Sequence, residues 1–330
     1  PPHRAGQRDP AGPDPTRPMT RRVALIGRTR LAVACLDVVL ASGDEVVAVI
    51  PDASDDGRDG WQPSLRRAAT DRGLPILHGG NVNDADFVRR VDELAPDFLL
   101  SFQAAPILRA PLIGTARIAA LNLHYGPLPR YRGVSPIAWA LLNGEPSHGV
   151  TLHVIEPGID SGPIVTGTDV PIRPNDTGRT LYDRCVDAGI GLMADAWPTV
   201  RAQTAVDAVP QDEARALYYN RHAMDFADRA IHWTQDCETI ANRIRAFIFP
   251  PFQYPEVTVR GAGTYAVRAM SWDRLSHRGR PGEILEVGPA GIVVAAPGGR
   301  ITLQSVAVGD HVVDEADMTA RGLVVGGFLV

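Results

Sequence analysis

Short apolar runs alternate with helix-period stretches along residues 22 to 201. Apolar runs typical of buried strands occupy residues 22–27, 45–50, 75–77, 98–102, 118–124 and 149–155. Between them, apolar positions recur at the three- and four-residue spacing of helices in 31–40, 64–72, 84–94 and 136–142. Strands that alternate with helices imply right-handed crossovers between parallel strands. The pattern therefore predicts an α/β fold with a Rossmann-like, mainly parallel sheet.

A longer helix closes this first region. Asp176 or Thr177 is a candidate N-cap for apolar positions that continue to Trp197, and we expect the domain to end near Arg201. The next residues are small, polar and weakly periodic, which is typical of a linker. We predict domains at 19–203 and 218–330, separated by a linker at 204–217.

The C-terminal region changes to short strands. Thr234 is predicted to cap a helix that ends near Phe247. The following strands are expected at 264–270, 283–287, 292–296 and 301–308. Gly-Pro-Ala-Gly at 288–291 and Pro-Gly-Gly at 297–299 are strong turn signals between them. This spacing predicts a small antiparallel barrel as the second domain.

The N-terminal residues differ from both domains. Residues 1–18 contain six prolines and no Val, Ile or Leu, so we expect a disordered or added leader with Met19 as the native start. No run approaches the length of a membrane span, and no apolar core of a secretory signal is present. We therefore expect a cytoplasmic protein without a membrane partner.

Composition narrows the possible chemistry. A net charge of −5 provides no general attraction for a polyanion, although a local arginine patch remains possible. All 33 basic residues are arginine, which excludes a lysine nucleophile or Schiff base. Cys35, Cys185 and Cys237 lie far apart without a Cys-x-x-Cys pair, so we expect buried thiols and no metal site.

Two polar residues end a predicted strand. Asn122 and His124 are two positions apart, so they point to the same face of the strand, at the carboxyl edge where α/β sheets bind ligands. Farther along, a glycine-flanked turn carries Asp160. Each residue alone could have an ordinary structural role, because Asn at strand ends, His in cores and Asp in turns are all common. Their order along the chain, rather than any one of them, is informative.

A dinucleotide site is the first alternative. Such a site needs Gly-x-Gly-x-x-Gly after the first strand so that a pyrophosphate can approach the backbone. The corresponding turn here, residues 27–31, contains one glycine. This argues against a nicotinamide cofactor.

The order of motifs resembles the formyltransferases that use 10-formyltetrahydrofolate. It comprises Asn-x-His at 122–124, Leu-Pro-x-Tyr-Arg-Gly at 128–133, Gly-Val-Thr at 149–151 and Asp-x-Gly-Pro-Ile at 160–164. The resemblance implies a formyltransferase fold at 19–203, an OB-like C-terminal domain and no metal. It also implies that Asn122, His124 and Asp160 are the catalytic residues.

Formyl transfer from a folate nitrogen to an amine needs oxyanion donors and a proton path. Under this resemblance Asn122 donates to the oxyanion, and His124 donates a second hydrogen bond or passes a proton to the leaving nitrogen. Asp160 holds His124 or relays the amine proton through water. His148 and His153 are expected to be structural. The folate contacts implied by the family are Phe102, Gln103, Ile107, Leu108 and the turn at Asp160.

The acceptor is less constrained. Relatives often carry Ser-Leu-Leu-Pro after the histidine, whereas this chain has Tyr125-Gly126-Pro127-Leu128-Pro129. This departure affects acceptor identity more than reaction type. The residues expected to contact the acceptor are Tyr125, Gly126, Arg130 and Arg132.

Family acceptors include initiator methionyl-tRNA, nucleotide-linked amino sugars and amines in natural-product or siderophore synthesis. The turn at 27–31 lacks the Gly-Ser-Gly phosphate loop of purine-pathway relatives, and residues 51–60 are acidic where the tRNA enzymes carry a basic insertion. We therefore favour a small amine, a nucleotide-linked amino sugar, over tRNA. A folate- or nucleotide-sugar-binding module without catalysis is the alternative from another class. The oligomeric state is left open, with a dimer possible.

Overall fold

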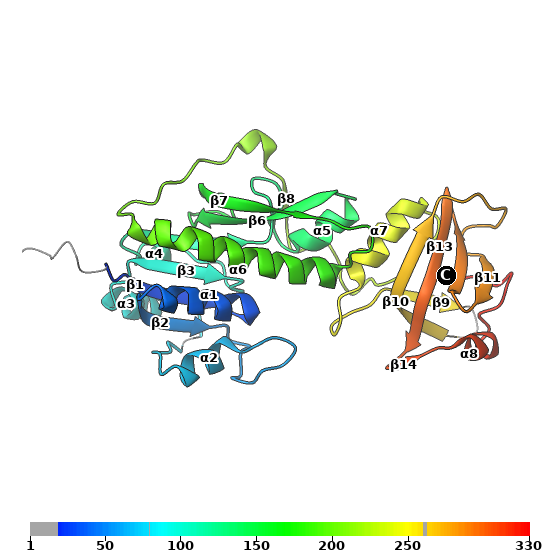
Figure 1. The fold of residues 1–330 in the computed structure, drawn as a ribbon, viewed down its shortest axis with the longest axis horizontal. Coiled ribbons are helices and arrows are strands. Elements are labelled where there is room, and N and C mark those ends of the chain that lie inside the picture. Colours follow the sequence, from blue (N-terminus) through cyan, green and yellow to red (C-terminus); the bar gives the residue numbers. More distant parts are fainter. Residues whose placement is uncertain (1–18, 79, 260–262) are drawn as a thin grey trace, which may run out of the picture.

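The computed structural model describes residues 19–78, 80–259 and 263–330. The predictions for residues 1–18 lie outside the described residues. Figure 1 shows an α/β body and a smaller β-rich domain at its C-terminal end, with helix α7 (Cys237–Phe247) between them. The α/β body has one apolar cluster on each face of its sheet, and the β-rich domain has a separate apolar core.

The first sheet has the order β2-β1-β3-β4-β6-β7. Its first four strands are parallel, and β6 and β7 are antiparallel additions at one edge. The strands are β1 (Arg22–Gly27), β2 (Glu45–Pro51), β3 (Phe98–Phe102), β4 (Ala119–His124), β6 (Ser147–Val154) and β7 (Ile164–Pro171). Val23 and Leu25 pack on one face of β1 while Ala24 and Ile26 pack on the other, so both faces are buried as a doubly covered sheet requires.

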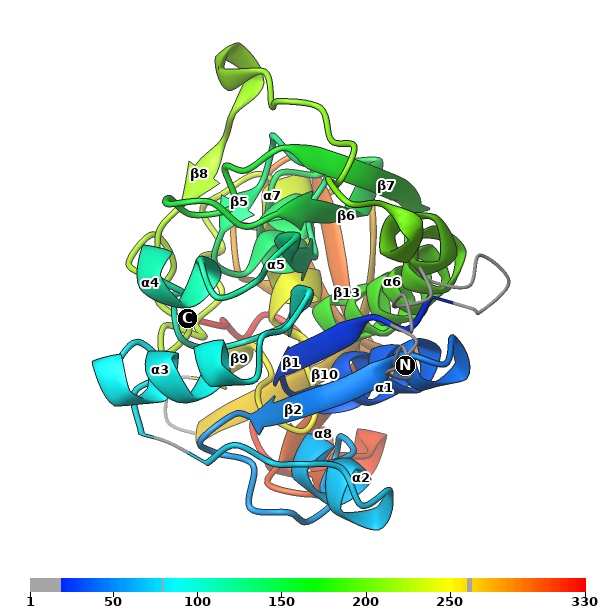
Figure 2. The same ribbon diagram turned by 90° about the vertical axis from the view of Figure 1, so that its left-hand side faces the viewer.

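Helices cover both faces of this sheet (Figure 2). Apolar residues of α1, α2, α5 and α6 join the core on one face, and those of α3 and α4 join the cluster on the other. The helices are α1 (Thr29–Ala41), α2 (Leu65–Asp71), α3 (Ala85–Glu93), α4 (Ala110–Ile113), α5 (Pro136–Leu142) and α6 (Gly178–Ala202). Thr177 caps α6 by accepting from the Thr180 N–H, as predicted.

Two strand predictions in this domain need correction. Residues 75–77 form only an isolated bridge, Val49 to Ile76, rather than a strand. Strand β7 was not predicted, because it is an edge strand rich in Thr, Gly and Asp whose residues are mostly half-buried or exposed. Edge strands bury one face or less, so they lack the apolar run that marks β1 and β3.

The predicted linker, residues 204–217, also makes contacts with the first domain. Val209 pairs with Ile164 at the end of β7, and η1 (Glu213–Arg215) follows. Strand β8 (Tyr218–Tyr219) then pairs with β5 (Arg132–Gly133) of the first domain. The segment therefore folds back along the α/β body before it reaches the second domain (Figure 2).

The C-terminal domain is an antiparallel half-barrel packed against α7 (Cys237–Phe247). Asp236, not Thr234, caps α7, because its carboxylate accepts the N–H groups of Glu238 and Thr239. The strand order is β11-β12-β13-β10-β9, with β14 on β13. The remaining elements are β9 (Glu256–Val259), β10 (Gly263–Asp273), β11 (Ile284–Gly288), β12 (Gly291–Ala296), β13 (Gly299–Val308), β14 (His311–Val312) and α8 (Glu315–Ala320). Of these, the sequence did not predict β9, β14 and α8.

Two further predictions can be compared with the described residues. Cys35, Cys185 and Cys237 are buried free thiols, as expected. No helix in the described part of the chain is long and apolar enough to cross a membrane.

Candidate active site

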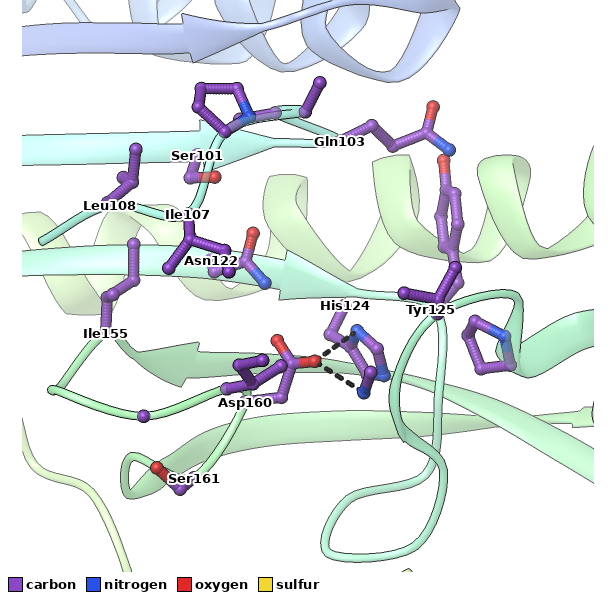
Figure 3. Close-up of a pocket in the computed structure, with 18 of the residues that line it drawn as sticks. Ser101, Gln103, Ile107, Leu108, Asn122, His124, Tyr125, Ile155, Asp160 and Ser161 are labelled. Atoms are coloured by element: carbon purple, nitrogen blue, oxygen red, sulfur yellow. Dashed lines mark hydrogen bonds and ion pairs between the residues drawn. The ribbon is translucent and has the colours of Figure 1, made fainter. Parts of the chain in front are cut away.

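A pocket of about 950 Å³ lies beyond the carboxyl ends of β3 and β4. Ser101 enters it from β3, and Asn122 and His124 enter it from β4 (Figure 3). The loop after β3, the loop after β5, the turn that carries Asp160, Tyr218 and residues 220–222 also line it, as do Arg28 and Asn83. The crevice thus occupies the edge of the sheet at which parallel α/β folds bind ligands.

His124 is buried and bound on both sides of its ring. Its Nε2 donates to the carbonyl oxygen of Tyr131 at 2.7 Å. Because a carbonyl only accepts, Nε2 carries the hydrogen of the neutral ring. Nδ1 lies 3.6 Å from Oδ2 of Asp160 (Figure 3). Nδ1 is therefore the position at which His124 can gain or lose a proton.

Asp160 faces two imidazoles from a left-handed backbone conformation. Its φ is 51°, and the turn also contains Gly158 at φ 131°. Oδ2 accepts the Gly133 N–H at 2.9 Å, and Oδ1 lies 3.6 Å from Nε2 of His153. Burial alone would raise the pKa of this carboxyl, but the adjacent imidazoles of His124 and His153 and the hydrogen bond from the Gly133 N–H together hold the pKa well below its usual range. Asp160 is consequently ionised at neutral pH.

Asn122 is oriented by a histidine on the neighbouring strand. The β4–β6 register pairs Asn122 with His153. Nδ1 of His153 donates to the Val154 carbonyl at 2.8 Å, which leaves Nε2 to accept from Nδ2 of Asn122 at 3.1 Å. The second amide hydrogen of Asn122 has no partner among the described residues, so it is available to a ligand in the pocket.

His153 is the site residue that the sequence analysis missed, since we expected it to be structural. The sequence signal was its place on a strand, three residues after Val150, but neither the direction nor the register of β6 could be derived from that position. The antiparallel pairing with β4 is what places its ring between Asn122 and Asp160.

The predicted folate contacts divide into two groups. Gln103, Ile107 and Leu108 line the pocket. Phe102 does not, because it is the last residue of β3 and its ring packs in the core on the α1 and α6 face. Oε1 of Gln103 accepts from the Thr29 hydroxyl at 2.6 Å and from the Tyr182 hydroxyl at 3.2 Å.

Of the four residues predicted to contact the acceptor, one lines the pocket and three do not. Tyr125 lines the pocket, and its buried hydroxyl has no hydrogen-bond partner among the described residues. Gly126 lies against the ring of His124, where a Cβ would stand 2.7 Å from Nε2. Arg130 and Arg132 are outside the pocket lining, since Arg130 pairs with Glu145 and Arg132 pairs with Glu213.

A second pocket of about 560 Å³ adjoins the first. Arg28 and Gln103 line both pockets. The second is formed mainly by the loop after β2 and by residues after α7. Its further lining includes Asp55, Asp56, Arg58, Trp61, Tyr182, Phe249 and Phe252.

Within the ranges that the structure describes, no group of three or more His, Cys, Asp or Glu side chains could hold a metal ion.

Comparisons with known proteins agree with this geometry. Residues 22–196 match the family described as Formyl transferase, and residues 224–321 match Formyl transferase, C-terminal domain. The methionyl-tRNA formyltransferase of Moorella thermoacetica is 32% identical over 288 residues, covering 86% of this chain and 91% of that protein.

Two solved structures are similar over most of the chain. One is an N-formyltransferase from Helicobacter canadensis in complex with folinic acid and dTDP-3-aminofucose, with 25% identity, a TM-score of 0.72 and coverage of 87% of this chain and 99% of that one. The other is WlaRD, a sugar 3N-formyl transferase in the presence of dTDP and 5-N-formyl-THF, with 25% identity, a TM-score of 0.70 and coverage of 87% and 98%.

These matches confirm the resemblance and the fold class predicted from the motifs. They also identify an enzyme, a transferase, rather than a binding module without catalysis. The chain belongs to the formyl transferase family.

Proposed function

We propose that this enzyme transfers the formyl group of 10-formyltetrahydrofolate to the primary amine of a nucleotide-linked amino sugar. The observation that carries the acceptor proposal is the second pocket, which shares Arg28 and Gln103 with the catalytic pocket. The Helicobacter canadensis enzyme and WlaRD, which are named for complexes with a folate and a dTDP ligand, support the same pairing of substrates.

The catalytic pocket suits a folate. Its volume is within the range of small-molecule sites, and its wall combines apolar side chains with the carboxylate of Asp160. Gln103, Ile107 and Leu108 would hold the folate. When bound, 10-formyltetrahydrofolate supplies a formyl carbon already bonded to nitrogen, so no metal or covalent enzyme intermediate is needed.

The chain's own residues then stabilise charge and move protons. The free amide hydrogen of Asn122 donates to the formyl oxygen as negative charge develops there. Asp160 is ionised and accepts the proton that the attacking amine must lose, directly or through a water molecule. His124, whose Nδ1 lies beside this carboxylate, passes that proton on to the leaving folate nitrogen. The bond from the acceptor nitrogen to the formyl carbon forms as the bond from that carbon to the folate nitrogen breaks, and the proton lost by the amine ends on the folate nitrogen, so the transfer is balanced.

The second pocket offers chemistry for a nucleotide. Trp61 contacts Phe252 edge to face, with ring centroids 4.8 Å apart, and both side chains are partly exposed. Aromatic surfaces of this kind bind flat bases, and guanidinium groups bind diphosphates. Arg58 lines this pocket, and Arg28 lies where it meets the catalytic one. We infer that the base occupies the aromatic surface while the amino sugar reaches Asn122.

Initiator methionyl-tRNA is the second candidate, favoured by the 32% identical relative from Moorella thermoacetica. The charges of the second pocket oppose it. Asp55 and Asp56 line this pocket, and carboxylates there repel a chain of phosphates more than a single diphosphate.

A panel of acceptors tests the proposal. The purified enzyme, 10-formyltetrahydrofolate and one acceptor at a time are analysed by mass spectrometry. We expect a formyl mass on a 3-amino or 4-amino deoxysugar nucleotide. Formylation of initiator tRNA alone would reject the sugar acceptor, and formylation of only hydroxylated ornithine or another free amine would reject both.

Variants of Trp61 test where the acceptor binds. Trp61→Ala should raise the KM for the sugar nucleotide by about tenfold, with kcat and the KM for folate little changed, because the lost contact is one of binding alone. Trp61→Phe keeps an aromatic surface and should retain most of the affinity. Equal KM values in all three proteins would place the acceptor elsewhere.

A further inference from the structure

The segment that follows α6 lies against the turn that carries Asp160. Val209 and Ile164 exchange two backbone hydrogen bonds of 2.8 Å. Farther along, β8 pairs with β5, so Val134 donates to the Tyr219 carbonyl at 2.9 Å. Residues 210–217 connect these two attachments.

Gln211 is the side chain by which this segment grips the turn. Its Nε2 donates to the carbonyl oxygens of Asp160 at 2.8 Å and Gly162 at 2.7 Å. Its Oε1 accepts from Nε and Nη2 of Arg132, at 3.0 and 2.8 Å. The amide therefore uses both hydrogens and its oxygen, and such a fully bonded group has one orientation.

Arg132 connects Gln211 to the other side of Asp160. Its guanidinium is nearly buried and also binds the Glu213 carboxylate, with contacts of 2.7 and 3.0 Å. The next residue, Gly133, donates its N–H to the Asp160 carboxylate. The backbone carbonyl of Asp160 is thus fixed through Gln211, and its side chain is fixed through Gly133.

These contacts to the backbone and to the side chain of Asp160 matter because this residue has a positive φ. The conformation is sparsely populated for a residue with a Cβ, and it persists where surrounding contacts determine it. Without the hydrogen bonds from Gln211, the backbone on the C-terminal side of Asp160 would lose two of the contacts that hold this conformation.

We propose that Gln211 is a positioning residue that holds Asp160 in its catalytic orientation. The inference rests on the proposed role of Asp160 in formyl transfer. It does not depend on which amine is the acceptor, because the comparison is between variants with whichever acceptor the wild type formylates.

The decisive variant is Gln211→Glu. It keeps an oxygen for Arg132 but removes the NH2 group that donates to the Asp160 and Gly162 carbonyls. We expect kcat to fall on the order of tenfold or more, with the KM for folate within about threefold. Gln211→Met removes the donor without adding charge and should reproduce the loss. Gln203→Glu is the matched control in the same segment, since an oxygen there can still accept the Asp207 N–H, and it should behave as wild type.

Two readouts separate positioning from a general structural role. In an Asp160→Asn background, Gln211→Glu should cause less than about a twofold further loss of kcat, because it acts through the same carboxylate. The imidazole NMR signals of His124 and His153 should move in Gln211→Glu and not in Gln203→Glu, which is observable without turnover. The proposal would be overturned if the kcat losses of Asp160→Asn and Gln211→Glu multiply in the double variant. Unchanged imidazole signals in Gln211→Glu, or near-native kcat in Gln211→Met, would also overturn it. If neither the wild type nor any variant formylates an amino sugar but the imidazole signals still move in Gln211→Glu, only the proposed acceptor is rejected.

Discussion

At the residue scale, each of the three proposed catalytic groups is held by a partner that leaves another of its polar atoms free. His153 binds one amide hydrogen of Asn122, and the Tyr131 carbonyl binds Nε2 of His124. The Gly133 N–H binds one oxygen of Asp160. What remains is one donor, one exchangeable proton and one charged acceptor in the same pocket. Such preorganised groups lower a barrier without rearranging during the reaction.

Truncating the donor or the proton carrier should therefore lower the rate of chemistry. We expect Asn122→Ala and His124→Ala each to lower kcat on the order of a hundredfold, with the dissociation constant of the folate little changed. Steady-state kinetics and equilibrium folate binding measure the two quantities. His232→Ala, an exposed histidine in the C-terminal region, is the control. Near-native turnover in His124→Ala would remove this residue from the mechanism.

Gly126 gives a second prediction at this scale. A Cβ there would lie 2.7 Å from Nε2 of His124 and 2.9 Å from the Tyr131 carbonyl, so it would break the bond that orients the ring. We expect Gly126→Ala to lower kcat by about tenfold or more in a folded protein. Gly191→Ala on α6, where a Cβ meets nothing within 4 Å, should leave kcat unchanged. Equal activity in the two variants would show that His124 needs no such support.

At the element scale, strand β6 carries two histidines with different roles. His153 faces the site, whereas His148 is fully buried and donates through Nε2 to the Tyr125 carbonyl at 2.7 Å. Burial lowers the pKa of His148 to about 4, so the folded protein keeps this ring neutral. Protonation of this ring therefore opposes folding.

This lowered pKa predicts an acid-sensitive fold. The unfolded ring binds protons below about pH 6.5, and the folded ring does so only below about 4, so stability is full above 6.5 and declines as pH falls between these values. The expected loss is at most about 3 kcal/mol by pH 4. Urea unfolding between pH 7.5 and 4 measures it. His148→Gln, which cannot titrate, should flatten that decline, and an equally steep decline in His148→Gln would assign it to other groups.

Elements with two buried faces were predictable from the sequence. Elements whose position depends on contacts with residues distant in the chain were not. Strands β1 and β3 have the predicted bounds because their residues are almost all buried, which requires a continuous apolar run. The segment around Gln211 read as a linker because its contacts are hydrogen bonds to residues distant in the chain. Similarly, the role of His153 required the β4–β6 register.

The same division applies to the pocket. Asn122, His124 and Asp160 were predicted from their motif, and the fold brings all three together. Arg132 belongs to the same motif, but its partners Gln211 and Glu213 lie about eighty positions away in the chain, so its structural use could not be predicted.

At the scale of the whole molecule, the second pocket lies at the junction of the two domains. Trp61 comes from the loop after β2, and Phe249 and Phe252 follow α7. The acidic loop residues are partly structural, since Asp55 accepts the backbone N–H of Arg66 at the start of α2 and the hydroxyl of Ser64. The proposed acceptor surface therefore combines aromatic side chains with carboxylates.

Such a surface predicts weak salt dependence. Each phosphate neutralised on a nucleic acid releases counterions, so an enzyme that grips tRNA through 6–10 phosphates loses about 10³ to 10⁵ in affinity between 50 and 200 mM salt. For a sugar nucleotide with one diphosphate we expect kcat/KM to change by less than about tenfold over this range. Initial rates across the salt series measure the slope. A change of a thousandfold would indicate a polyphosphate partner.

Formyl transfer to a nucleotide-linked amino sugar is measured most directly by a competition between two acceptors. The enzyme receives a limiting amount of isotopically labelled 10-formyltetrahydrofolate together with equal concentrations of a 3- or 4-amino deoxysugar nucleotide and initiator methionyl-tRNA. Mass spectrometry then follows the label. We predict that it enters the sugar nucleotide in the wild type and enters neither acceptor in His124→Ala within the same time. Label found only on the tRNA, or equal labelling of the sugar by His124→Ala, would contradict this account.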